Sequence, residues 1–101
     1  MSHVASLFPG SQHIDKALSL DNKDLCTSID ATGCSVAGDY PKRISLTLSA
    51  ILNSGTILLL ITGKEKLDIV ENAINRSPRN ELPVSHILNQ STTDVQVFWS
   101  E

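Results

Sequence analysis

The chain has 101 residues, of which 41% are hydrophobic and 19% are charged, a composition typical of a globular domain and not of a disordered or membrane-spanning chain. This length suits one domain, so we predict a single domain over residues 1–101. The formal net charge is -3, and no basic stripe is present, which excludes nucleic acid as a partner. The longest apolar run, 57–61, is too short to cross a bilayer, so no membrane partner is expected.

The first 41 residues carry weak structural signals. Prolines and glycines interrupt this part of the chain repeatedly, so the elements between them are predicted to be short. In chain order, we predict a loop over 1–12, a short helix over 11–17, a polar connection over 19–24, a strand over 25–32 and an irregular loop over 33–41.

Stronger signals begin at Arg43. Apolar residues at positions 44, 46 and 48 alternate with Ser45 and Thr47, which is the period of a strand whose apolar face is buried. One helical turn is predicted over 49–53. Residues 56–61 then form a continuous run of mostly branched apolar side chains, which is typical of a central parallel strand covered on both faces.

A helix is predicted directly after this strand. Thr62 can act as its N-cap, with Glu65 three residues later completing a capping box, and the helix is predicted to run to about Asn75. Residues 83–88 cannot be assigned a type, and residues 95–99 alternate as a last strand. A strand, a helix and a strand in this order predict a βαβ unit, and hence an α/β fold with a parallel sheet.

The turn after the apolar strand is the first candidate site. A helix N-terminus at the carboxyl end of a parallel strand offers free N–H groups to an anion. Lys64 and Lys66 lie in the first helical turn, where cations are unfavourable unless an anion compensates them. The alternative is two solvated lysines, with Lys64 paired to Asp68 four residues later.

Arg43 and His3 are further candidates. Arginine suits bidentate binding of phosphate, although a charged residue at the edge of a strand explains Arg43 equally well. A histidine can accept a proton near neutral pH and activate water, whereas a lone histidine near an N-terminus is usually only solvated. His13 and His86 are expected to be surface residues. Cys26 and Cys34 do not have the spacing of a metal site, so we expect two reduced thiols and no metal.

Three stretches resemble the 6-phosphogluconolactonases, in the order in which that family has them. Residues 3–11 read HVASLFPGS and are similar to the family signature, in which Asp-Gly-His precedes a Thr/Val-Ala-Ser-Leu-Phe-Pro-Gly run. Residues 41–48 read PKRISLTL and are similar to its Pro-x-Arg-Ile-Thr-Leu-Thr strand. Residues 62–66 read TGKEK and are similar to its Gly-x-x-Lys turn.

The resemblance implies a fold shared with glucosamine-6-phosphate deaminases and ribose-5-phosphate isomerases, here a partial Rossmann-like parallel sheet with flanking helices. It implies hydrolysis of 6-phosphogluconolactone to 6-phosphogluconate, in the pentose phosphate pathway of the cytoplasm, without a cofactor. By position, His3 matches the catalytic histidine and would act as general base on the attacking water. Arg43 and Lys66 match the residues that hold the phosphate of the substrate.

The sequence also departs from the family pattern. The resemblance covers only the C-terminal half of the family's proteins, and Met1-Ser2 stands where the family has Asp-Gly. We therefore expect His3 to lie on an unanchored segment without its acidic partner, which would make it a poor base. The missing strands would leave an open sheet edge, so a homo-oligomer or a complementing N-terminal chain is expected. Two alternatives to a weakly active lactonase are a non-catalytic sugar-phosphate binder and a protein-interaction module.

Overall fold

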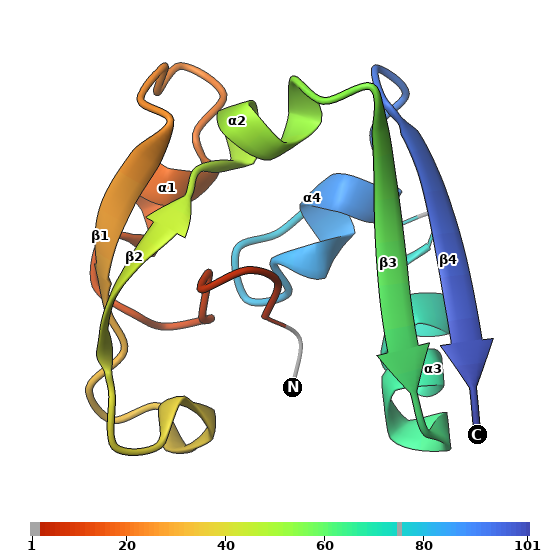
Figure 1. The fold of residues 1–101 in the computed structure, drawn as a ribbon, viewed down its shortest axis with the longest axis horizontal. Helices are drawn as coiled ribbons and strands as arrows, with labels where there is room; N and C mark the ends of the chain where they lie inside the picture. Colours follow the sequence, from red (N-terminus) through yellow and green to blue (C-terminus); the bar gives the residue numbers. More distant parts are fainter. Residues whose placement is uncertain (1–2, 75) are drawn as a thin grey trace.

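The computed structural model describes residues 3–74 and 76–101, and it has an α/β architecture in which two small sheets flank short helices (Figure 1). The predicted fold class is confirmed. The elements are, in chain order, α1 (Ile14–Leu18), β1 (Cys26–Asp30), the 3-10 helix η1 (Ser35–Ala37), β2 (Lys42–Leu46), α2 (Leu48–Leu52), β3 (Thr56–Thr62), α3 (Lys64–Ala73), α4 (Val84–Leu88) and β4 (Asp94–Ser100).

The predicted βαβ unit is present. Strands β3 and β4 pair in parallel, in a register that runs from Thr56 opposite Asp94 to Thr62 opposite Ser100. Helices α3 and α4 form the connection between the two strands, and Figure 1 shows α3 behind the strand pair, against which it packs. The sequence did not predict the secondary structure of residues 83–88. In the structure, Pro83 is the N-cap of helix α4, which belongs to this connection.

The predicted covering of β3 on both faces is wrong. Its side chains alternate between half-buried and exposed along the whole strand. Leu58 and Leu60 are 59% and 73% exposed, whereas Ile57, Leu59 and Ile61 face the interior. A continuous apolar run predicts two covered faces, but among the described residues helices cover only one of them.

The second sheet pairs β1 with β2 in antiparallel orientation, with Cys26 opposite Leu46 and Asp30 opposite Lys42. The predicted burial of the apolar face of β2 is wrong, because Ile44 is 77% exposed and Ser45 is buried. The hydroxyl of Ser45 accepts a hydrogen bond from the backbone N–H of Ser6 at 3.2 Å. A satisfied hydroxyl costs little to bury, so the polar face of β2 can turn inward.

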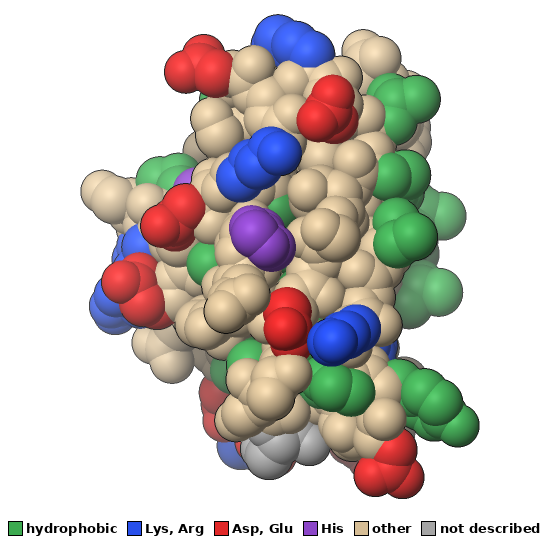
Figure 2. Space-filling view, turned by 90° about the vertical axis from the view of Figure 1, so that its left-hand side faces the viewer, with side chains coloured by type: hydrophobic (Ala, Val, Ile, Leu, Met, Phe, Trp, Pro, Cys, Tyr) green, Lys and Arg blue, Asp and Glu red, His purple; other side chains and the backbone are tan. Residues whose placement is uncertain are grey.

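The exposed side chains of the β1–β2 sheet contribute to an apolar surface. Figure 2 looks at the side of the molecule that carries this sheet, and apolar side chains gather along one edge of the view. Large exposed apolar residues of this sheet and its approach are Leu25, Ile44 and Leu46. Both sheets therefore leave apolar side chains in solvent.

The buried core lies between the N-terminal segment, α1, β1 and α2, and it reaches the C-terminal half through Ile87 of α4. Its apolar members are Leu7, Phe8, Ile14, Ala17, Leu18, Ile29, Ala31, Ala37, Leu48 and Ile87. Because Leu7 and Phe8 are almost completely buried, the core anchors the segment that follows His3.

Candidate functional site

The segment that follows His3 is anchored, so the expectation of an unanchored histidine is wrong. The backbone N–H of Leu7 donates to the carbonyl of Val4 at 2.9 Å, which closes a tight turn. The bond from the N–H of Ser6 to Ser45 fixes this turn to β2. His3 is therefore the residue directly before a turn fixed by the core. Met1 and Ser2, the positions of the expected acidic partner, lie outside the described residues.

His3 stacks on Phe8. The two ring centroids are 4.4 Å apart and the ring planes are inclined by 21°. Burial lowers the pKa of His3 below its usual value, and nearby positive charges, including those of Arg43 and Lys66, lower that pKa further. The imidazole is therefore neutral at pH 7 and able to accept a proton. Its Nδ1 atom is buried and has no hydrogen-bond partner among the described residues.

Arg43 lies over the same phenyl ring. Its guanidinium carbon is 5.0 Å from the centroid of Phe8, which is within the range of a cation–π interaction. Nε of Arg43 donates to the carbonyl of Tyr40 at 2.9 Å, and one terminal nitrogen donates to the carbonyl of Ala37 at 2.9 Å. These two hydrogen bonds fix the orientation of the guanidinium group, and its remaining N–H groups can bind an anion.

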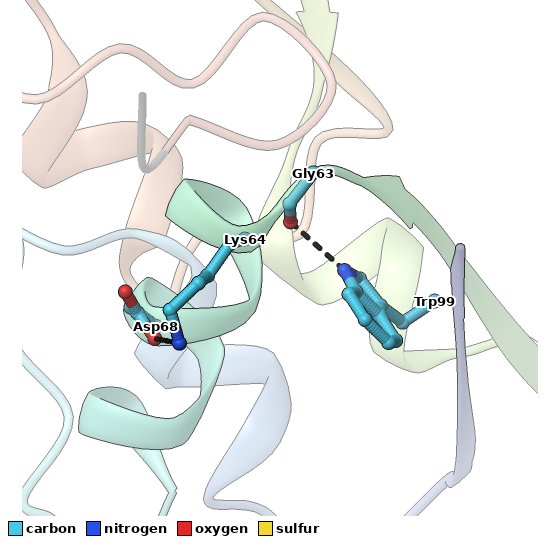
Figure 3. Close-up of polar contacts among 4 residues, drawn as sticks. All are labelled: Gly63, Lys64, Asp68 and Trp99. Carbon is cyan, nitrogen blue, oxygen red and sulfur yellow. Dashed lines mark hydrogen bonds and ion pairs between the residues drawn. The ribbon is translucent and has the colours of Figure 1, made fainter. Parts of the chain in front are cut away.

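Lys66 comes from the other half of the chain, in the first turn of α3. The predicted capping box is wrong: the N-cap is Gly63, with φ of 86° and no side-chain cap. The indole N–H of Trp99 donates to the carbonyl of Gly63 at 2.8 Å and ties the turn to β4 (Figure 3). Lys64 pairs with Asp68 at 3.8 Å, as its alternative interpretation predicted, and Lys66 is exposed beside it.

One cavity of about 730 Å³ brings the two halves together, and both His3 and Lys66 line it. Its other walls are apolar, and they come from β3, from helices α2, α3 and α4, from Val36 and from the turn after His3. The structure thus places His3 and Arg43 on the ring of Phe8, and His3 and Lys66 in the lining of one cavity. Arg43 does not line the cavity itself.

The positive charges of this site lack acidic partners. Within residues 3–74 and 76–101, Lys64 and Asp68 form the only ion pair closer than 4.0 Å, so Arg43 and Lys66 are not paired with a carboxylate there. Two uncompensated cations that both lower the pKa of one histidine create a local positive potential suited to an anion. In the same residues, no group of three His, Cys, Asp or Glu side chains has metal-binding geometry, and both cysteines are free.

The remaining histidines lie apart from the site. His13 is exposed, as predicted. His86, also predicted to be a surface residue, is half-exposed, and its Nε2 lies 2.9 Å from Oδ1 of Asn80. Sequence reasoning also missed the role of Phe8, although the residue lies inside the most specific of the resembling stretches.

Comparison with known proteins gives a family. The family model for glucosamine-6-phosphate isomerases/6-phosphogluconolactonase matches residues 2–99. The chain belongs to this family. A 6-phosphogluconolactonase of Xylella fastidiosa is 36% identical over 97 residues, which are 96% of this chain and 40% of the relative. That of Caulobacter vibrioides is 34% identical over 99 residues, or 98% of this chain and 40% of the relative.

Solved structures agree with this assignment. A 6-phosphogluconolactonase from Shewanella baltica superposes with a TM-score of 0.86 at 34% identity, over 99% of this chain and 40% of that chain. One from Neisseria gonorrhoeae, described as putative, gives a TM-score of 0.84 at 29% identity, over 99% and 41%. The chain therefore spans about two fifths of the length of the relatives that it matches. None of the described helices is long and apolar enough to span a membrane.

Proposed function

We propose that the chain carries the general base and the phosphate-binding cations of a 6-phosphogluconolactonase, which hydrolyses 6-phosphogluconolactone to 6-phosphogluconate in the pentose phosphate pathway of the cytoplasm. One arrangement carries the proposal: His3 and Arg43 both contact the ring of Phe8, and His3 and Lys66 both line one cavity. The names of the relatives support the same chemistry.

In this proposal, His3 removes a proton from the water that attacks the lactone carbonyl. The base must be unprotonated, and the lowered pKa of His3 meets that requirement at pH 7. Arg43 and Lys66 bind the phosphate of the substrate, which holds the lactone ring in place. A bound phosphate also offsets the two positive charges that lower the pKa of His3. Substrate binding therefore makes His3 a stronger base at the moment when it is needed.

A non-catalytic sugar-phosphate binder is the second candidate. The observation that favours it is the buried Nδ1 of His3, which has no acceptor in the described part of the chain. A catalytic histidine usually donates from one ring nitrogen to an acceptor, which fixes the other as the base. Without that acceptor, the site retains its two cations and binds a phosphate without accelerating hydrolysis.

The test measures binding and hydrolysis separately. Binding of 6-phosphogluconate is followed by calorimetry, and lactone opening is followed against the spontaneous rate in the same buffer. Because the relatives are longer, hydrolysis is measured both for this chain alone and for this chain mixed with the part of the Xylella fastidiosa relative outside the matched segment. We expect His3→Ala to lower any catalysed rate by about 100- to 10,000-fold and to leave binding nearly unchanged.

The cations are tested with matched controls. Lys66→Ala and Arg43→Lys are expected to weaken binding by about 10- to 100-fold, since each removes charge-assisted hydrogen bonds to phosphate. Lys64→Ala is the control, because this lysine pairs with Asp68 at the surface. Saturable binding without any acceleration in either preparation would establish the non-catalytic alternative. Equal binding by the Lys64 and Lys66 variants would refute the assigned phosphate site.

A further inference from the structure

Residues 31–41 form a closed loop between the two strands of the antiparallel sheet. The backbone N–H of Ala31 donates to the carbonyl of Pro41 at 2.8 Å. This bond directly follows the last pair of the ladder, Asp30 opposite Lys42. The two ends of the loop therefore lie side by side, and Figure 1 shows the segment that joins them between β1 and β2. A compact loop of this length with adjacent ends is frequently functional.

Backbone bonds and buried side chains fix the conformation of this loop. The N–H of Cys34 donates to the carbonyl of Ala31 at 2.8 Å, and that of Ala37 donates to the carbonyl of Cys34 at 3.0 Å. Both alanines are buried members of the core. The thiol of Cys34 also donates to the carbonyl of Pro9 at 3.7 Å. The loop is thus held by the same core that anchors the turn after His3.

The loop supplies both carbonyls that orient Arg43. Ala37 and Tyr40 each accept a hydrogen bond of 2.9 Å from its guanidinium group, and the ring of Phe8 lies 5.0 Å from its central carbon. The side chain of Tyr40 is 79% exposed, so this residue acts through its backbone. A free arginine side chain loses much rotamer entropy when it binds an anion, whereas a guanidinium group that is already oriented loses less.

Backbone carbonyls suit a cation that has to bind a phosphate. They are neutral, so they leave the positive charge of Arg43 uncompensated, whereas a carboxylate partner would offset much of it. Within residues 3–74 and 76–101, no carboxylate lies within 4.0 Å of this guanidinium group. The two bonds therefore orient the side chain and still leave its charge to an anion.

Gly38 lies between the two carbonyls and gives the loop its turn. Its φ is 63°, in the left-handed region that residues other than glycine, asparagine and aspartate rarely adopt. A Cβ atom at this position would meet nothing within 4 Å. The backbone conformation, and not a lack of space, therefore requires the glycine. That conformation determines where the carbonyls of Ala37 and Tyr40 point.

We propose that residues 31–41 are a positioning loop for the phosphate-binding arginine, and that Gly38 is the residue on which its geometry depends. The left-handed turn at Gly38 directs two carbonyls at Arg43, and these carbonyls hold the guanidinium group on the ring of Phe8. The effect of the loop on phosphate binding rests on the proposed function, whereas its effect on the orientation of Arg43 does not.

Two matched glycine substitutions test the proposal. Gly33 belongs to the same loop, has a φ of 91° and also has open space at the Cβ position, but it is not adjacent to either carbonyl that holds Arg43. Gly38→Ala and Gly33→Ala should therefore destabilise the chain alike in urea unfolding. Only Gly38→Ala should weaken binding of 6-phosphogluconate, by about 10-fold. Gly38→Asn should restore most of that binding, because asparagine tolerates the left-handed region.

A measurement without ligand follows Arg43 directly. Hydrogen bonding slows the exchange of an N–H proton with water, so the NMR signal of the Nε–H group reports the bond to Tyr40. The signal should be protected in the wild type and in Gly33→Ala, and it should be lost in Gly38→Ala. Since Arg43 is one of the charges that lower the pKa of His3, that pKa should rise in Gly38→Ala only.

The two measurements separate this inference from the proposed function. Equal binding by the Gly38→Ala and Gly33→Ala variants would overturn the inference. An Nε–H signal that is unprotected in the wild type, or that stays protected in Gly38→Ala, would overturn it as well. A wild-type chain that does not bind 6-phosphogluconate, but loses the signal only in Gly38→Ala, would refute the proposed function and leave the positioning of Arg43 standing.

Discussion

Replacing Phe8 by leucine should remove the common support of His3 and Arg43. The phenyl ring is almost completely buried, stacks on His3 at 4.4 Å and lies 5.0 Å from the guanidinium carbon of Arg43. An aromatic pair contributes about 0.5–1.5 kcal/mol beyond its burial, and a cation–π interaction about 0.5–2 kcal/mol. The Leu variant should therefore lose about 1–3.5 kcal/mol, which a small domain with about 5–15 kcal/mol of stability survives.

The assay is urea unfolding followed by the fluorescence of Trp99, the single tryptophan of the chain. Double-mutant cycles combine Phe8→Leu with Arg43→Gln, and the expected coupling energy is about 0.5–2 kcal/mol. Phe8→Leu combined with Lys23→Ala, at an exposed lysine that bonds the carbonyl of Leu20 and not the ring of Phe8, is the control and should be additive within about 0.5 kcal/mol. A coupling to Arg43 no larger than this control would refute the role of the ring.

Three further outcomes are expected in the same unfolding assay. The pKa values of His3 and His86 lie below the usual 6.5, chiefly because burial disfavours the charged ring. In acid the unfolded chain then binds more protons than the folded chain. The contribution of these two histidines to the free energy of unfolding is therefore complete above about pH 6.5 and is lost as the pH drops through the folded pKa values. Stability that stays flat or rises with acid would contradict this. Thr47→Val should cost about 1–3 kcal/mol, because the buried hydroxyl makes two hydrogen bonds, at 2.6 and 3.2 Å; Thr47→Ser should retain most of that stability. Gly63→Ala should cost about 1–3 kcal/mol, because φ is 86° there, whereas Gly55→Ala has open space and no positive φ and should be nearly neutral.

The parts of the fold that depend on local pattern could be predicted. The apolar run at 56–61, the helix after it and the alternating strand near the end are local signals, and together they predicted the βαβ unit. The inward face of β2 could not be predicted. It depends on the bond between Ser6 and Ser45, which are 39 positions apart, and no local periodicity contains that contact.

The candidate site shows the same division. His3, Arg43 and Lys66 were named because their stretches resemble a family, and local physics alone gave each of them a solvated alternative. What the sequence did not contain is the contact of Phe8 with both His3 and Arg43. The predicted N-cap of α3 was wrong for a different reason. Thr62 and Gly63 are adjacent candidates for that position, and the structure uses Gly63, which has a positive φ.

The register of the parallel pair has a consequence for biosynthesis. Strand β3 begins at Thr56, and its partner begins only at Asp94. A ribosome releases the antiparallel β1–β2 hairpin early, but it releases the apolar β3 well before the strand that stabilises it. During that interval the nascent chain carries the uncharged segment TILLLIT without its parallel partner β4. The yield of soluble protein should therefore depend on how fast residues 63–93 are translated, and on chaperones that hold extended apolar segments.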